Sequence, residues 1–168
     1  MRTFFSSDTH FFHHNILAYT ERDKLWDSVE DMNEGLINRW NSVVGKGDRV
    51  FIIGDVALGG KSKAKLLAEI LKRLHGTKFL VPGNHDTYIL ESEECRKQFT
   101  LLPPLHEVKI SDPTLPKRRN GKNSRQTIVL CHFPLRVWNR NGVGAWHLFG
   151  HSHGSLDGIG KSFDVGID

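Results

Sequence analysis

Cysteine is scarce in this chain: Cys95 and Cys131 are the only two among 168 residues. They form no Cys-x-x-Cys pair, so the sequence indicates no disulfide framework. Cys131 ends the apolar run Ile128–Cys131, where a small buried thiol is expected rather than a metal ligand. Any metal chemistry is therefore expected to rest on oxygen and nitrogen donors.

Long apolar segments are also missing. The longest apolar runs have the length of a strand, far below the roughly 20 residues that cross a membrane. Met1–Phe5 is too short for a signal peptide and leads directly into polar residues. These absences predict that the protein has no membrane partner, and a reducing, cytoplasmic setting is the expectation that follows.

Internal repeats, linkers and low-complexity blocks are absent as well, so residues 1–168 are expected to form one domain. A domain of this length buries about 68–70% of the surface of its unfolded chain. The apolar fraction of 38% and the charged fraction of 25% are ordinary for a soluble globular protein. The net charge of +4 allows anionic partners but more often serves solubility, and no feature sets an oligomeric state.

Hydrophobic patterns along the chain predict an α/β domain. Apolar residues at helical spacing predict helices at 29–40, after a cap at Asp27 or Ser28, and at 61–75, with a weaker helix at 87–99. The expected strands are 3–7, 49–53, 78–81, 106–111, 126–131, 146–149 and 161–167. Strands and helices alternate at first and strands dominate later, which is typical of a layered α/β fold.

Short polar motifs follow the ends of these expected strands. They read Asp8-x-His10, Gly54-Asp55, Gly83-Asn84-His85-Asp86, His132 and Gly150-His151-x-His153. In α/β folds, loops beyond the carboxyl ends of strands project side chains into one crevice. A lone histidine is usually structural, but so many candidate ligands after successive strands together favour a metal site.

The motifs offer nitrogen and oxygen donors without thiolate. Such a set suits manganese, iron, zinc or nickel better than calcium or magnesium, which prefer oxygen shells. Asp55 could bridge two ions, one through each carboxylate oxygen. Two ions about 3.5–4 Å apart would polarise a phosphoryl group and lower the pKa of a bridging water, and the resulting hydroxide could attack phosphorus in line. The sequence thus predicts two divalent metal ions as cofactors, with manganese as the first expectation.

The motifs, in this order, resemble those of the calcineurin-like metallophosphoesterases over nearly the whole chain. The small bacterial and phage phosphoesterases are the most similar type, because a Phe and then a His follow their first motif, as Phe11 and His13 do here. The resemblance implies a four-layer α/β/β/α sandwich of two mixed β-sheets flanked by helices, with a dinuclear metal centre.

The resemblance also implies roles for single residues. It assigns one metal to Asp8, His10, Asp55 and His153. It assigns the other to Asp55, Asn84, His132 and His151, with Asp55 as the bridge. His85 is then left as the general acid that protonates the leaving oxygen, and Asp86 would orient the His85 ring.

Two departures from the family pattern narrow the class. Protein Ser/Thr phosphatases of this superfamily carry an arginine soon after the Gly-Asp motif and another just before the Asn-His motif, and neither 56–60 nor 81–83 contains one. Protein phosphatase activity is therefore not expected. The segment 163–168 resembles a strand that family members usually continue past.

Several residues have two possible roles. His13 and Arg136 are candidate contacts to substrate phosphate, and a solvated or capping role is the alternative for His13. The basic turn Lys117–Arg125 is expected to be a hairpin tip, with contact to a nucleic-acid backbone as the alternative. Trp138 and Trp146 are candidates for the core or for an aromatic wall beside the substrate.

The expected function is that of a metal-dependent phosphoesterase, with phosphodiesters as the first substrate class. A nuclease acting on DNA or RNA and a phosphomonoesterase are the alternatives. A non-catalytic scaffold would have lost some of its metal ligands, and this sequence keeps the full set. The motifs predict the reaction class and leave the substrate and the native metal open.

Overall fold

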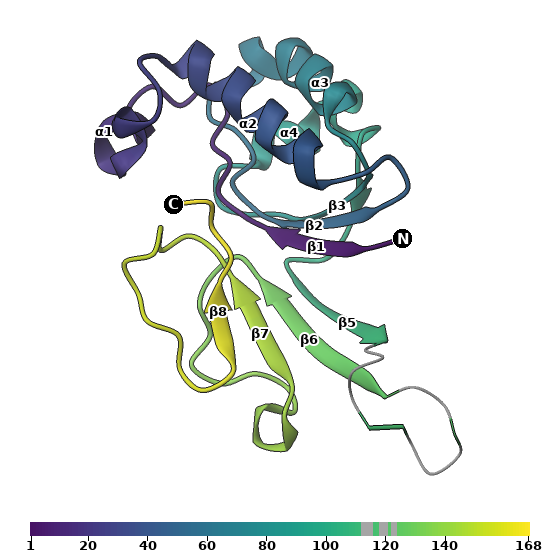
Figure 1. The fold of residues 1–168 in the computed structure, drawn as a ribbon. Helices are drawn as coiled ribbons and strands as arrows, with labels where there is room; N and C mark the ends of the chain where they lie inside the picture. Colours follow the sequence, from purple (N-terminus) through teal and green to yellow (C-terminus); the bar gives the residue numbers. More distant parts are fainter. Residues whose placement is uncertain (112–115, 118–120, 122–123) are drawn as a thin grey trace.

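Two four-stranded β-sheets face each other, and helices cover the outer face of the first sheet (Figure 1). The computed structural model describes residues 1–111, 116–117, 121 and 124–168. Strands between residues 3 and 101 form the first sheet, and strands between residues 105 and 164 form the second. Each sheet therefore comes from one continuous part of the sequence.

The first sheet is parallel throughout and has the strand order β1-β2-β3-β4. Its strands are β1 (Thr3–Ser6), β2 (Arg49–Ile53), β3 (Thr77–Val81) and β4 (Thr100–Leu101). Parallel neighbours need crossover connections, and helices occupy these connections here. The register pairs Ser6 with Ile52 and Ile53 with Val81, so the carboxyl ends of three strands lie at one edge of the sheet.

The α-helices that the structure describes lie between residues 16 and 96. They are α1 (Ile16–Tyr19), α2 (Val29–Val43), α3 (Ala64–Arg73), α4 (Thr87–Glu91) and α5 (Glu93–Arg96), with the 3₁₀ turns η1 (Glu21–Lys24) and η2 (Lys61–Lys63). Ser28 caps α2, because its hydroxyl accepts a hydrogen bond from the Asp31 N–H at 3.1 Å. The expected helix over 87–99 is split at Ser92, whose backbone is extended and whose hydroxyl caps α5.

The second sheet is mixed and has the order β5-β6-β7-β8. Its strands are β5 (Leu105–Ser111), β6 (Arg125–Cys131), β7 (Trp146–Phe149) and β8 (Ser162–Asp164). β5 and β6 are antiparallel, whereas β6, β7 and β8 run parallel to one another. Loops and the short 3₁₀ turn η3 (Asn141–Val143) make the parallel connections.

Alternation along β2 separates the core into two layers. Val50 and Ile52 face the helices, where they join a cluster with apolar residues of α2 and α3. Phe51 and Ile53 face the second sheet and pack in a cluster with residues such as Leu130. A strand that is buried on both faces is expected to be almost continuously apolar, as this one is.

The expected α/β architecture of two sheets with flanking helices is confirmed, and two of its details differ. The first sheet is parallel rather than mixed. After Arg96, the residues that the structure describes form no α-helix, so the second sheet has no helical cover among them. The loop 150–161 contains four glycines, which oppose helix formation by about 1 kcal/mol each relative to alanine.

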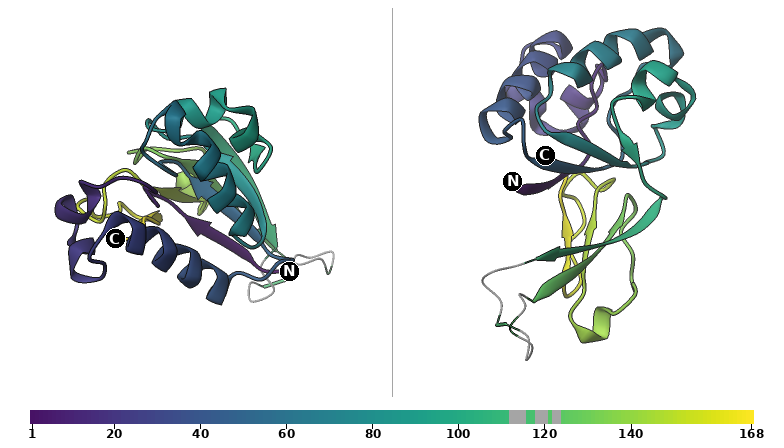
Figure 2. Two further views of the ribbon diagram at one scale, coloured as in Figure 1. Left: turned by 90° about the horizontal axis from the view of Figure 1, so that it is seen from above. Right: turned by 90° about the vertical axis from the view of Figure 1, so that its right-hand side faces the viewer.

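The last strand is shorter than the expected 161–167. After β8 the chain turns toward the end of β1, where the Ser7 N–H donates to the Val165 carbonyl oxygen at 3.0 Å. The C-terminal residues therefore lie beside the first sheet, on the side where α1 is placed (Figure 2). None of the helices described above is long and apolar enough to cross a membrane.

Candidate metal centre

The polar motifs meet where the carboxyl ends of strands from both sheets approach each other, beside the C-terminal segment (Figure 1). Their backbone is unusual, because five non-glycine residues have positive φ angles between 48° and 67°. These are Asp8, His10, Asp55, His151 and His153. Such left-handed conformations are unfavourable by about 1 kcal/mol or more each and cluster at functional sites. They turn the chain sharply, so that side chains two positions apart point into one space.

The first ligand group consists of Asp8, His10 and His153, whose donor atoms lie within 4.8 Å of one another. Asp8 Oδ1 is 3.7 Å from His10 Nε2 and 4.0 Å from His153 Nε2. Asp8 Oδ1 and His10 Nε2 are both buried, and neither has a hydrogen-bond partner among the residues described. A buried polar atom without a partner is unfavourable, so this arrangement fits a bound cation.

The second group consists of Asp55, His132 and His151, also within 4.8 Å. His132 Nε2 lies 3.3 Å from Asp55 Oδ2 and 3.0 Å from Asn84 Oδ1. The other ring nitrogen of His132, Nδ1, is 2.8 Å from the Ile53 carbonyl oxygen and can donate to it. That contact orients the ring so that Nε2 faces the remaining ligands.

Asp55 lies between the two groups. Its Oδ2 atom is 3.8 Å from His10 Nε2 and 3.3 Å from His132 Nε2. Oδ1 accepts a hydrogen bond from the His85 N–H at 3.0 Å. The sequence suggested one carboxylate oxygen for each ion, whereas the geometry directs Oδ2 toward both groups because Oδ1 is already engaged.

The charges of this site are strongly coupled. Burial acts to raise the pKa of Asp55, but hydrogen bonds from His132 and from the His85 N–H outweigh it and hold the value at about 2. Burial acts to lower the pKa of His132, but the neighbouring Asp55 carboxylate raises it overall. Asp55 is therefore negatively charged at neutral pH, as a metal-bridging residue must be.

Asp86 has different partners from those expected. It is fully buried, and its carboxylate accepts hydrogen bonds from the N–H groups of Gly83, Asp55 and Val56 at 2.8–3.0 Å. Because both oxygens are occupied by these donors, the hydrogen bonds described do not join Asp86 to the His85 ring. Burial raises the pKa of Asp86. The carboxylate ties the turn after β3 to the end of β2.

His85 projects from this turn into the open side of the site. Its side chain is 42% exposed, and its Nε2 lies 3.9 Å from Asp55 Oδ2. The ring also meets the His10 ring edge to face, with a centroid distance of 5.9 Å. His85 thus lies beside both ligand groups while it stays accessible.

A hollow of about 400 Å³ opens over the ligands. It is lined by His10, His13, Ile16, Tyr19, Thr20, Asp55, Leu58, His85, His151 and His153. One wall is α1, which sequence patterns did not predict because four residues are too few for a helical period. The Nδ1 atoms of His13 and His10 lie 3.3 Å apart. Burial lowers the pKa of His13 to about 4, with a smaller contribution from the charge of His10.

The other candidate substrate contacts lie elsewhere. Arg136 is exposed in the loop after β6 and does not line the hollow. Trp138 donates to the Ala145 carbonyl oxygen and packs against His147, so it is a structural residue. Trp146 begins β7, at the opposite end from His151. The basic turn Lys117–Arg125 lies mostly outside the described residues.

Two residues that the motifs did not reveal support the site from behind. Asp168 lies 2.5 Å from His153, between Oδ2 and Nδ1, and raises the pKa of that histidine. Arg22, which is 3% exposed, forms an ion pair with the same carboxylate. The two residues are 146 positions apart, so no local pattern could have connected them.

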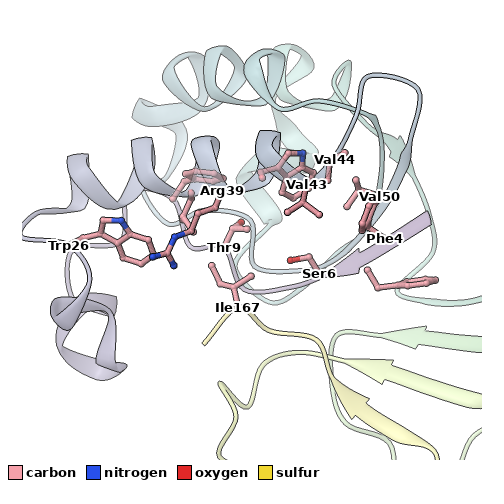
Figure 3. Close-up of a pocket in the computed structure, with 13 residues that line it drawn as sticks. Phe4, Ser6, Thr9, Trp26, Arg39, Val43, Val44, Val50 and Ile167 are labelled. Atoms are coloured by element: carbon pink, nitrogen blue, oxygen red, sulfur yellow. The ribbon is translucent and has the colours of Figure 1, made fainter. Parts of the chain in front are cut away.

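A second hollow is distinct from this site. It has a volume of about 270 Å³, lies between α2 and β1, and is lined mainly by apolar side chains (Figure 3). Ile167 of the C-terminal segment points into it, whereas none of the candidate metal ligands lines it. The hollow therefore bears on how the C-terminal segment is seated rather than on the ligand groups.

Several known proteins are similar in sequence to this chain. The gene 66 protein of Mycobacterium phage D29 is 37% identical over 163 residues, which cover 90% of this chain and 78% of that protein. The uncharacterized protein MJ1445 of Methanocaldococcus jannaschii is 45% identical over 82 residues, which cover 49% of this chain and 45% of that protein. The gene 66 protein of Mycobacterium phage L5 is 41% identical over 85 residues, covering 50% of this chain and 39% of that protein. In these last two alignments, the chain spans less than half of the relative's length.

A solved structure shares the fold. The crystal structure of AQ665 from Aquifex aeolicus, a protein of unknown function, matches with a TM-score of 0.67 and 19% identity, over 99% of this chain and 91% of that one. Residues 1–155 match the family model of calcineurin-like phosphoesterases. This stretch of the chain contains every motif described above. The chain therefore belongs to the calcineurin-like phosphoesterase family, whose members are hydrolases that act on phosphoester bonds.

Proposed function

We propose that this protein is a metal-dependent phosphoesterase that hydrolyses phosphodiesters. The observation that carries the proposal is the meeting of two ligand groups at Asp55 Oδ2. The buried, unpartnered atoms Asp8 Oδ1 and His10 Nε2 add to it, because a cation would satisfy both. Membership of the family supports the same reaction class.

The ligand assignment follows the two groups. One ion would be held by Asp8, His10, Asp55 and His153, and the other by Asp55, Asn84, His132 and His151. When bound, the two ions would polarise the phosphoryl group and activate water as the nucleophile. Manganese is the proposed metal, with iron, zinc and nickel as the ions that the same donors also accept.

His85 is the proposed general acid. Its ring is accessible from the hollow and lies beside Asp55, so it can reach the oxygen that leaves phosphorus and give it a proton. Asp86 would help indirectly, because it holds the backbone turn from which His85 projects. An acid on the open side suits a leaving group that departs toward solvent.

The lining of the hollow favours diesters over monoesters. A phosphate monoester carries about 1.5–2 negative charges at neutral pH, whereas a diester carries one. Among the residues that the structure describes, none of those that line the hollow is a lysine or an arginine. With its pKa at about 4, His13 is neutral at pH 7 and can donate a hydrogen bond to phosphate without adding charge.

The test uses bis(p-nitrophenyl) phosphate and p-nitrophenyl phosphate with Mn²⁺. We expect turnover of the diester to exceed that of the monoester, and expect Asp55→Asn and His85→Ala to lower it at least a hundredfold. Asp157→Asn and His106→Ala are matched controls, because neither residue belongs to a ligand group or lines the hollow. Wild-type turnover in both site variants with metal supplied would contradict the proposal.

Nucleic acid is one class of diester that the positive net charge allows. Oligonucleotide hydrolysis that falls steeply as salt rises would identify a nuclease. Hydrolysis of small diesters without any cleavage of oligonucleotides would exclude that alternative.

A further inference from the structure

The two ring nitrogens of His153 face different carboxylates. Its Nε2 atom faces the first ligand group, 4.0 Å from Asp8 Oδ1, and its Nδ1 atom lies 2.5 Å from Asp168 Oδ2. A histidine that donates from Nδ1 to a carboxylate presents the Nε2 lone pair at the opposite side of the ring. Asp168 therefore fixes both the ring orientation and the nitrogen that is free to bind.

Asp168 is in turn held at two points by Arg22. The Arg22 Nε donates to Oδ1 at 2.6 Å, and Nη2 donates to Oδ2 at 2.9 Å. The side chains of Arg22 and Asp168 are only 4% and 8% exposed. A buried two-point contact between a guanidinium and a carboxylate has a defined geometry, so it sets where Asp168 can lie.

The same guanidinium also holds the backbone that carries the other ligands of this group. Arg22 Nη2 donates to the Asp8 carbonyl oxygen at 2.7 Å, and Nη1 donates to the Thr9 carbonyl oxygen at 3.0 Å. All three nitrogens of Arg22 are thus engaged within the protein. This excludes the usual alternative for an arginine near such a site, namely a direct grip on substrate phosphate.

The support is specific to one ligand group. In the second group, His132 is oriented by the Ile53 carbonyl oxygen, and the contacts described for Arg22 and Asp168 do not reach it. The C-terminal segment has other contacts as well, since Ile167 lines the hollow between α2 and β1 (Figure 3) and the Ser7 N–H donates to the Val165 carbonyl oxygen.

We propose that Arg22 and Asp168 are positioning residues for the metal ion of the first group, acting through His153. The inference rests on the proposed metal centre and adds that the two ions differ in what supports them. Outer partners of metal-bound histidines typically change metal affinity by 10–100-fold. Loss of this pair should therefore weaken one ion selectively.

The experiment is a calorimetric titration of metal-free protein with Mn²⁺. For wild type we expect two ions per chain. For Asp168→Ala we expect one ion with wild-type affinity and a second weakened by about 10–100-fold. Arg22→Lys should weaken the same ion by less, because lysine restores the charge but not the two-point geometry. Asp157→Ala, which removes an exposed carboxylate of the neighbouring loop, should bind both ions as wild type does.

A thermal melt of each metal-free variant separates positioning from folding, and a folded Asp168→Ala chain is expected. The inference is overturned if Asp168→Ala binds both ions with wild-type affinity, or if both ions weaken equally. If the wild-type protein binds no metal, both the proposed function and this inference are refuted. Wild-type protein that binds two ions but hydrolyses no diester would refute the function alone.

Discussion

Asp86 offers a sharp test because its buried carboxylate holds three backbone groups and the expected partner, the His85 ring, is not among them. In Asp86→Ala, the N–H groups of Gly83, Asp55 and Val56 all lose their acceptor. A buried donor left unsatisfied is unfavourable by about 1–3 kcal/mol, and relief from burying a charge offsets part of the sum. We expect the free energy of unfolding to fall by about 3–5 kcal/mol.

Asp86→Asn separates the contributions. Its amide oxygen can take the place of Oδ2, which accepts from Gly83 and Asp55, but its NH₂ group then faces the Val56 N–H. One hydrogen bond is lost instead of three, so the free energy of unfolding of this variant should fall by about 1–2 kcal/mol.

The assay is urea unfolding of metal-free protein, with Asp157→Ala as a control expected to stay within about 0.5 kcal/mol of wild type. If the free energy of unfolding of Asp86→Ala falls by less than about 1 kcal/mol while turnover falls, Asp86 does not act by holding the backbone. The result would instead favour a direct contact of Asp86 with the His85 ring.

Three further predictions concern other parts of the molecule. The Arg2 N–H, the Gly45 N–H and the Arg2 side chain hold the pKa of Asp48 at about 2. The ionised carboxylate therefore stabilises the fold above its unfolded pKa, and this stabilisation is lost as the pH falls toward 2. In urea unfolding, the free energy of unfolding should fall less between pH 7 and pH 3 in Asp48→Asn than in wild type. Neutral His13 can give phosphate a hydrogen bond but no charge, so His13→Gln should keep kcat/KM for a diester within about tenfold of wild type. His13→Asp should lower kcat/KM much further, because its carboxylate repels phosphate. Equal losses in the two variants would contradict a contact between His13 and phosphate. A Cβ on Gly150 would collide with Ser7 Oγ and Asp8 Oδ2, so Gly150→Ala should lose about 1–3 kcal/mol in thermal unfolding, while Gly142→Ala, which meets open space, should not.

Sequence patterns predicted strands best where an apolar run ends at a glycine. The strands 49–53 and 146–149 have the predicted bounds, because Gly54 and Gly150 follow them directly. The split at Ser92 was not predicted, since its side chain can cap a new helix as readily as it can continue an old one. The shortening of β8 depends on contact with Ser7, which no local pattern records.

The candidate site divides in the same way. The ligand motifs could be predicted because each follows a strand, and strand ends converge at one edge of a sheet. The partners of Asp86 could not be predicted, because Asp55 and Val56 lie in the segment after β2, 31 and 30 positions away in the sequence. Arg22 lies in the polar stretch Glu21–Lys24, where nothing distinguishes a buried arginine from a solvated one.

The central claim is that two ions share Asp55, and anomalous diffraction from crystals grown with Mn²⁺ tests it most directly. We predict two peaks about 3.5–4 Å apart. One should lie among Asp8, His10 and His153, the other beside Asn84, His132 and His151, and both should contact the Asp55 carboxylate. A single peak, or two peaks of which only one contacts Asp55, would contradict the account.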